Sequence, residues 1–318
     1  MQRSVLIAAF LLAFCLAGCD RKAEPHSARD ASVNTKTSTN IYQVKGVVHD
    51  IMPDKNKVKI AHEEIPGYMA AMTMTFDVKN QSELAGIKPG DTVSFRMLVT
   101  SDDGWLDTIV KLNTNAPTPV AAAPDAFRRV RDVDPLEIGD TMPDYHFTNE
   151  LGKAVSLADY KGQSVAITFI FTRCPFPTFC PKMSTSFRDA QNLLKRRADA
   201  PTNWHLFTIS FDPFFDTPPV LSQYAKRFDA DPQRWNFLTG DLIDITAIAE
   251  QFGLIFWRPD PKEVTGISHN LRTVVIDARG KVFKVMKENE WKPETLADAL
   301  IQAANSNPGA KPPAPTSR

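Results

Sequence analysis

This sequence has no net charge and few cysteines. The 318 residues carry 37 Lys and Arg against 37 Asp and Glu, so the formal net charge is zero, and only four residues are cysteine. A chain without excess positive charge lacks the basic surface expected of a nucleic-acid-binding protein. The sequence also contains no internal repeat. With 43% hydrophobic and 23% charged residues, its composition is that of a globular protein long enough for two domains.

A long hydrophobic run is also lacking, because the apolar stretch near the N-terminus, from Val5 to Leu16, is short for a bilayer span. It follows Arg3 and ends in small residues, a pattern that predicts a secretory signal. The tetrapeptide Leu-Ala-Gly-Cys that ends at Cys19 resembles a bacterial lipobox, which implies that Cys19 is the lipidated first residue of the mature protein. Asp20 resembles the signal that keeps such lipoproteins at the inner membrane, on the periplasmic face. A plain signal peptide with an incidental cysteine is the alternative.

This interpretation leaves two cysteines for chemistry in the folded protein. Cys15 is removed with the signal, and Cys19 carries lipid. The remaining pair, Cys174 and Cys180, then lies in an oxidising compartment, where a disulfide is permitted. These two thiols are the whole thiol chemistry of the mature chain.

Composition divides the rest of the chain into two compact segments separated by polar or proline-rich ones. The residues after the signal are polar, which is typical of a flexible tether, and a Pro- and Ala-rich stretch marks a linker between domains. The C-terminal residues have a disordered composition. The predicted order is a lipoprotein signal peptide, a tether, a small domain, a linker, a larger domain and a tail, at 1–19, 20–40, 41–114, 115–134, 135–304 and 305–318.

The first domain is β-patterned. Short segments that alternate apolar and polar residues follow one another, separated by turn-forming sequences such as "PDKN" and "KPG". Five such strands in a small domain predict a closed barrel of the OB type. The expected strands are 41–48, 57–62, 72–78, 91–99 and 105–112.

The second domain alternates strands and helices, which predicts an α/β sheet covered by helices. A buried strand at 165–171 runs into the cysteine-bearing turn and then into a helix, as in a thioredoxin-like fold. The other expected strands are 204–211, 236–240, 271–277 and 281–286. The expected helices are 182–197, 218–228, 242–252 and 292–304.

The stretch "FTRCPFPTFCPKM" places five residues between Cys174 and Cys180. Pro181 favours the first turn of a helix, so Cys180 is expected near a helix N-terminus, where the dipole favours the thiolate. A thiolate serves equally as a nucleophile and as a soft metal ligand. Three interpretations remain open: a structural disulfide, a redox-active pair and a pair of metal ligands. The short loop gains little from a structural disulfide, which disfavours the first.

Four motifs occur in the order found in Sco/SenC proteins: "FIFTRCPFPTFCPKM", "ISFDPFFDTP", "WNFLTG" and "ISHNLRTVVID". The region 135–304 therefore resembles that family of copper-binding assembly factors for cytochrome c oxidase. The resemblance implies that Cys174, Cys180 and His269 hold copper, as Cu(I) or Cu(II). It also implies a partner, the oxidase subunit that carries the copper-A centre. One departure is the loop, because the usual family spacing has three residues between the cysteines.

Two aspartates near these motifs have less specific expectations. Asp216 precedes Thr-Pro-Pro and is expected to cap a helix. Asp212 either orients groups near the copper site, as the resemblance implies, or serves in a turn.

The first domain carries the stretch "AHEEIPGYMAAMTMTF", which places Met72, Met74 and Phe76 on one face of a strand. His62 ends the preceding strand, and a histidine beside two thioethers suits Cu(I) or Ag(I). The structural alternative is that Met72 and Met74 only pack in the hydrophobic core. The segment resembles CusF-like periplasmic copper and silver chaperones, which implies that His62, Met72 and Met74 are ligands. That family often has a capping Trp where this chain has Met69, which either adds a third thioether or simply packs.

These features predict a membrane-anchored periplasmic copper chaperone with a Cys/Cys/His site and an auxiliary His/Met site, and not primarily an enzyme. One alternative is a thiol-disulfide oxidoreductase, although thioredoxin-type enzymes place their cysteines two residues apart. Another is a resistance protein that buffers copper or silver. Other periplasmic copper carriers are further possible partners. A peroxidase is disfavoured because the Pro-x-x-x-Thr-x-x-Cys arrangement is missing before Cys174.

Overall fold

The computed structural model describes residues 39–69, 71–101, 103–112, 133–257 and 267–306. The predicted signal peptide with Cys19 lies outside the described residues, as do nearly all of the predicted tether, linker and tail. Within the described ranges, no helix combines the length and the apolarity that a bilayer crossing needs.

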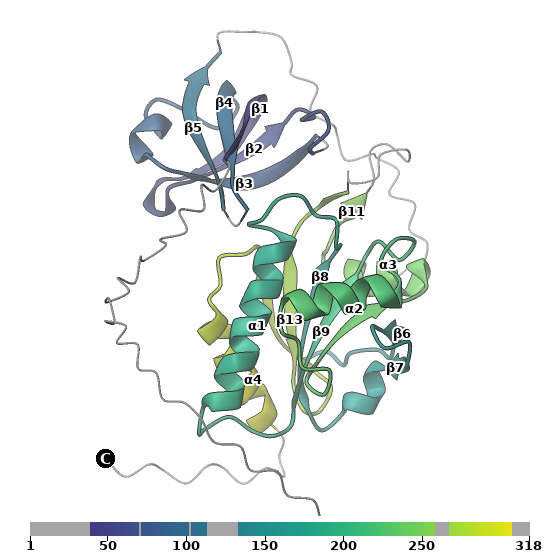
Figure 1. Cartoon of the computed structure of the whole chain (residues 1–318). Coiled ribbons are helices and arrows are strands. Elements are labelled where there is room, and N and C mark those ends of the chain that lie inside the picture. The colour runs from purple at the N-terminus through teal and green to yellow at the C-terminus, as the bar shows by residue number, and fades with distance from the viewer. Residues whose placement is uncertain (1–38, 70, 102, 113–132, 258–266, 307–318) are drawn as a thin grey trace, which may run out of the picture. The chain divides into compact units, whose positions relative to one another are not determined.

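The N-terminal domain is a closed barrel of five strands (Figure 1). Its strands follow the barrel order β1-β2-β3-β5-β4. Of the strand pairs in the described part of the barrel, β3 with β5 is parallel and the others are antiparallel. Alternate residues of β3 are buried, as a strand with one face toward the core requires. The predicted small all-β barrel is confirmed, and each expected strand is present. The strands are β1 (Asn40–Met52), β2 (Lys57–His62), β3 (Met72–Val78), β4 (Thr92–Val99) and β5 (Gly104–Lys111).

The C-terminal domain is built on a seven-stranded sheet in the order β14-β13-β8-β9-β10-β6-β7. The central strands β8 and β9 run parallel and are buried along their whole length, which explains why both are rich in apolar residues. The predicted thioredoxin-like fold is confirmed. The strands are β6 (His146–Asn149), β7 (Ala154–Ser156), β8 (Ser164–Ile170), β9 (Trp204–Ser210), β10 (Trp235–Thr239), β13 (Arg272–Ile276) and β14 (Val282–Lys287).

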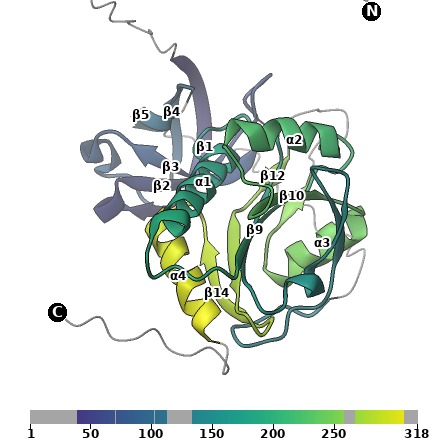
Figure 2. The ribbon, with the colours of Figure 1, turned by 60° about the horizontal axis from the view of Figure 1, so that its bottom comes forward.

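Four helices cover this sheet. Figure 2 shows α1 and α4 along one face and α3 on the opposite face. Each is amphipathic or largely buried, so the sheet has apolar cover on both sides. The helices are α1 (Cys180–Arg196), α2 (Pro218–Arg227), α3 (Leu242–Gln251) and α4 (Pro293–Asn305).

Two pairs of short strands were not predicted from the sequence. The hairpin of β6 and β7 lies at the sheet edge, and its strands of four and three residues are too short for a clear alternation. The pair β11 (Phe256–Trp257) and β12 (Ser268–His269) is shorter still, and its two halves are far apart in the sequence. Short 3-10 turns complete the described chain at Pro53–Lys55, Gln81–Leu84 and Leu157–Tyr160.

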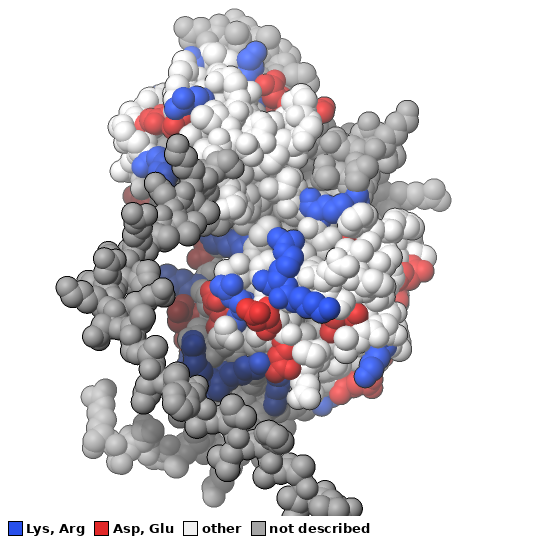
Figure 3. Space-filling model, viewed as in Figure 1, with Lys and Arg blue, Asp and Glu red and all other residues white. Residues whose placement is uncertain are grey.

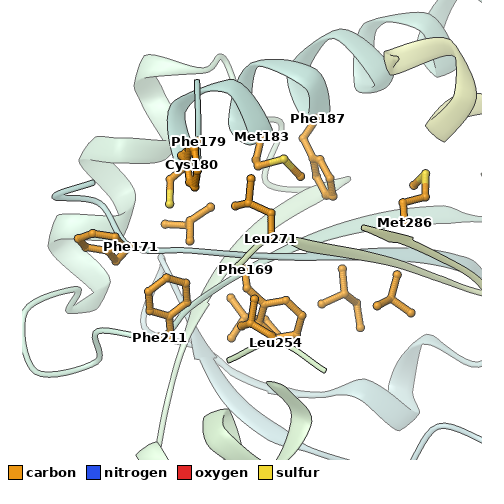
Figure 4. Close-up of a cluster of buried hydrophobic side chains, with 14 of the residues drawn as sticks. Phe169, Phe171, Phe179, Cys180, Met183, Phe187, Phe211, Leu254, Leu271 and Met286 are labelled. Carbon is orange, nitrogen blue, oxygen red and sulfur yellow. The ribbon is translucent and has the colours of Figure 1, made fainter. Parts of the chain in front are cut away.

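The core of the C-terminal domain fixes the start of α1 (Figure 4). Met183 and Phe187 of that helix are fully buried and point onto the sheet near Phe169 and Leu271. Burying side chains of this size stabilises the fold by about 1.5 to 3 kcal/mol each. The first turn of α1, with Cys180, is therefore anchored by packing from the turns that follow it.

The charged side chains of the molecule are mixed. On the face shown in Figure 3, Lys and Arg are interspersed with Asp and Glu. This agrees with the zero net charge and gives that face no broad surface of one sign.

Candidate metal centre

Three separate elements bring two sulfurs and one imidazole together. Cys174 follows β8 in a turn where its amide donates to the carbonyl of Phe171 at 3.2 Å. Cys180 is the first residue of α1, and His269 lies on β12, paired with Phe256 of β11. The ligand atoms of Cys174, Cys180 and His269 all lie within 4.8 Å of one another. The five-residue loop therefore does not keep the two sulfurs apart.

His269 presents one ring nitrogen to the thiols. Its Nδ1 donates to the carbonyl of Asn270 at 2.9 Å, so Nε2 keeps its lone pair for a ligand, and this Nε2 lies 3.7 Å from the Sγ of Cys180. Phe171, Phe179 and Phe211 surround the ring, with centroids 5.0 to 5.8 Å away. This aromatic enclosure holds the imidazole and excludes water. The motifs quoted above contain all three phenylalanines, but their spacing does not indicate that they meet around one imidazole.

The two thiols differ in acidity, and the expectation for Cys180 is wrong. Burial raises the pKa of Cys180 well above its ordinary value, and the neighbouring Cys174 adds to the effect. Burial opposes ionisation of Cys174 as well, but hydrogen bonds with Cys180 and His269 outweigh it and hold its pKa well below the ordinary value. The helix N-terminus does not compensate for the complete burial of Cys180. The thiolate therefore forms first at Cys174.

Both cysteines are free in the structure, with Cys180 buried and Cys174 partly exposed. A soft ion that enters this site meets two sulfurs and one neutral nitrogen, a donor set that suits Cu(I). The same proximity leaves disulfide formation open to an external oxidant.

Asp216 does not cap α2 as expected. The N-cap of α2 is Thr217, which makes no capping bond with its side chain. Instead the fully buried carboxylate of Asp216 accepts hydrogen bonds from the amide and hydroxyl of Thr172 and from the hydroxyl of Ser210. It ties the ends of β8 and β9 together beneath the cysteine turn. Burial raises its pKa, against the effect of these hydrogen bonds.

Asp212 pairs with the guanidinium of Arg173, the residue before Cys174. The same guanidinium lies 3.8 Å from the ring centroid of Phe215, a cation–π contact. Asp212 is almost fully buried, so this pair is shielded from solvent. Its position favours the expectation that Asp212 orients groups near the site over a simple turn role.

We expect Asp216→Ala to lower the free energy of unfolding by about 2 to 4 kcal/mol, because it leaves one buried and two partly buried donors without an acceptor. Thermal and denaturant unfolding of the reduced protein would measure the loss. Asp199→Ala, at a side chain that is 56% exposed, is the control and should change stability little. Equal stability of the two variants would contradict the structural role given to Asp216.

The barrel places its predicted ligands on one face at the end of two paired strands. His62 of β2 lies directly opposite Met72 of β3, and Met74 is opposite Ile60. His62 is 2% exposed, and its Nδ1 donates to the carbonyl of Glu63 at 2.7 Å. Within the described part of the chain its Nε2 is buried and has no hydrogen-bond partner. A buried ring nitrogen without a partner is costly unless a ligand completes it.

The buried His62 remains neutral over a wide pH range. Burial lowers the pKa of His62 to about 4, partly offset by its hydrogen bond to Glu63. A neutral imidazole is the form that binds metals.

Met69 lies beside the predicted ligands of the barrel, whereas its neighbour Tyr68 is engaged elsewhere. Tyr68 stacks on Tyr42, with ring centroids 4.4 Å apart, and is engaged there. Met69 is buried and lines the same cavity as Met72 and Met74. The position of the expected aromatic cap therefore holds a third thioether.

Two family models match this chain, each over a separate region. A family model described as SCO1/SenC matches residues 133–305, and one described as copper binding periplasmic protein CusF matches residues 41–113. The SCO1 protein homolog of Bacillus subtilis is 31% identical over 153 residues, which are 48% of this chain and 75% of that protein. A SCO2-like protein of Rickettsia felis is 29% identical over 157 residues, 48% of this chain and 70% of its own. Among solved structures, a SCO1/SenC family lipoprotein from Bacillus anthracis is 28% identical, covers 52% of this chain and 95% of its own, and has a TM-score of 0.46.

The SCO1/SenC match spans more than half of the sequence and contains Cys174, Cys180 and His269. This chain belongs to the SCO1/SenC family and carries a CusF-like domain ahead of the family domain.

Proposed function

We propose that this protein is a periplasmic copper chaperone that holds copper at Cys174, Cys180 and His269 and delivers it during assembly of cytochrome c oxidase. The observation that carries the proposal is the convergence of two thiols and one imidazole nitrogen within 4.8 Å. Two sulfurs and a neutral nitrogen prefer Cu(I), and a small rearrangement admits Cu(II). Family membership supports the copper-A subunit of the oxidase as the recipient.

The barrel is proposed as an auxiliary Cu(I) site formed by His62, Met72 and Met74, with Met69 beside them. The unpartnered Nε2 of His62 and the register that sets it opposite Met72 support this role. Thioethers and a neutral imidazole form a soft site without net charge, which would also accept Ag(I).

A lipid anchor at Cys19 would keep the chaperone on the periplasmic face of the inner membrane. Acyl chains contribute about 0.8 kcal/mol per buried CH2, so several chains on one cysteine hold firmly. The lipobox sequence at 16–19 supports the anchor.

A thiol-disulfide oxidoreductase is the second candidate, favoured by two free thiols that lie close enough to form a disulfide after a small movement. A buffer for copper or silver is the third. It shares every ligand with the chaperone and differs only in the absence of a recipient.

Anaerobic titration of the reduced, unlipidated protein with Cu(I) tests the proposal. We expect two equivalents for the wild type and one after Cys174→Ser. The pair Met72→Leu and Met74→Leu removes both thioethers at nearly constant volume and should also leave one. Met97→Leu, in the fully buried barrel core, is the matched control and should retain two.

Delivery is tested by mixing the loaded protein with the soluble copper-A domain of the oxidase subunit. Appearance of copper in the recipient supports the chaperone, and retention of copper by a fully loaded protein supports the buffer. An unchanged stoichiometry after Cys174→Ser would contradict the proposed site itself.

A further inference from the structure

The loop between the two cysteines packs against the barrel. Phe176, in this loop, is 2% exposed. Its ring meets that of Phe76 of β3 edge-on, with the two ring centroids 6.1 Å apart. Gly104 of β5 lies beneath the same ring, and a Cβ at Gly104 would stand 2.9 Å from the Cζ of Phe176. Phe176 therefore fits against the barrel only because Gly104 has no side chain.

A hydrogen bond holds the same loop at a second point. The hydroxyl of Tyr68 donates to the carbonyl of Pro175 at 3.2 Å. Stacking on Tyr42 fixes the Tyr68 ring, so its hydroxyl is already positioned for this bond. The residues from 37 onward accordingly form one compact unit.

Between these contacts lies a small cavity of about 20 Å³ that both candidate sites share. Its wall includes Met69, Met72 and Met74 of the barrel and Cys174, Phe176 and His269 of the C-terminal domain. A cavity of this size has room for a small ion. The atoms that line it are mostly apolar carbon and sulfur, which disfavours a hydrated ion and favours a soft one.

We propose that the five-residue loop is a docking element that seats the barrel so that Cu(I) passes directly from its methionines to Cys174 inside this cavity. The inference rests on the proposed function and adds a route to it. In the transfer, a copper–thioether bond to Met72 or Met74 breaks and a copper–sulfur bond to Cys174 forms. The proton of the thiol, where present, leaves to solvent, and the ion remains Cu(I), so no electron is exchanged. His269 and Cys180 then complete the second site.

The length of the loop agrees with this role. Pro175 and Phe176 make the contacts with Tyr68, Phe76 and Gly104, whereas Phe179 packs on His269. The loop thus contains two residues that contact the barrel in addition to the one that packs on the imidazole.

The experiment measures how fast the thiolate site loads. Reduced full-length mature protein is mixed in an anaerobic stopped-flow with less than one equivalent of Cu(I) in acetonitrile-containing buffer, and the near-UV copper–thiolate absorption is followed. We expect Met72→Leu with Met74→Leu to slow this loading at least about tenfold, since an ion already in the cavity faces Cys174 at a high effective concentration. The equilibrium affinity of the thiolate site for Cu(I) should be the same in this double variant as in the wild type.

Gly104→Ala displaces Phe176 without touching any proposed ligand, and it should abolish the dependence of the loading rate on the methionines. Phe176→Leu in the Gly104→Ala background removes the clashing atoms and should restore that dependence. Val110→Ala, at a barrel residue that is 52% exposed, is the control. If Gly104→Ala does not fold, Phe176→Ala removes the same contact by deletion.

Two results would overturn the handover: loading that is equally fast with and without the methionines in the wild-type background, or a methionine dependence that persists unchanged in Gly104→Ala. Neither would affect the proposed function. That function fails on a separate result, the absence of the copper–thiolate band at equilibrium.

Discussion

His269→Ala is expected to weaken Cu(I) binding at the thiolate site by at least about 100-fold, because even residues that only orient a metal ligand cost about 10- to 100-fold when replaced. The Nε2 of His269 lies 3.7 Å from Cys180, and Phe171, Phe179 and Phe211 hold the ring in place. These three neighbouring rings contain no nitrogen, so none of them can replace the lost imidazole ligand. Competition with a chromophoric Cu(I) chelator at fixed pH measures the change.

His205→Gln is the matched control for this substitution. His205 is the other buried histidine of the same domain, and its Nε2 bonds with the side-chain oxygen of Asn236 at 2.8 Å. Its replacement should lower stability and leave copper affinity within about twofold. The insulin-reduction assay, run on the same variants, separates the candidate functions. Unchanged copper affinity in His269→Ala, together with rapid disulfide reduction, would favour the oxidoreductase over the chaperone.

Periodic patterns allowed most of the fold to be predicted. All five barrel strands follow from alternating residues, and β8 follows from a continuous apolar run. Both patterns record burial on one or two faces, which is a local property of the sequence. The hairpin of β6 and β7 has too few residues for a pattern and depends on pairing with β10, a long-range contact.

The residues of the metal site could be predicted from the sequence, but the pKa shifts of its thiols could not. The motifs indicated Cys174, Cys180 and His269 by resemblance, and the structure brings the three together. The expectation that the helix dipole favours the thiolate of Cys180 was wrong because burial raises the pKa of that thiol, and a helix-start signal does not contain the depth of burial. The role of Asp216 was wrong for a similar reason, since its partners Thr172 and Ser210 come from two other strand ends.

Docking by the cysteine loop was also beyond the sequence. The loop is longer than the usual family spacing, and in the structure Pro175 and Phe176 of this loop contact the barrel. The missing side chain at Gly104 matters only once Phe176 is placed against it. Such a pair is recognisable from packing and has no signature in either segment alone.

The two proposed copper sites differ in what their ligands do with protons. Binding at the second site must displace a proton from Cys180, whose pKa is raised well above its ordinary value by burial. Thioethers carry no proton, and the pKa of His62 is lowered to about 4 by burial, so the barrel ligands are ready to bind at any pH above about 5. Acidification therefore opposes copper binding at one site and hardly affects the other.

Lowering the pH from 7.5 to 5.5 is accordingly expected to shift the ratio of Cu(I) affinities about 100-fold toward the barrel, since each proton displaced contributes about tenfold per pH unit. The sign follows because Cys180 is protonated throughout this range in the copper-free protein, while His62 is neutral throughout it. Cu(I) competition on the Cys174→Ser variant isolates the barrel site, and the Met72→Leu and Met74→Leu pair isolates the thiolate site. Circular dichroism at each pH confirms that both variants remain folded. A thiolate site whose affinity is flat from pH 5.5 to 7.5 would mean that copper displaces no proton there, which is incompatible with Cys180 as a ligand.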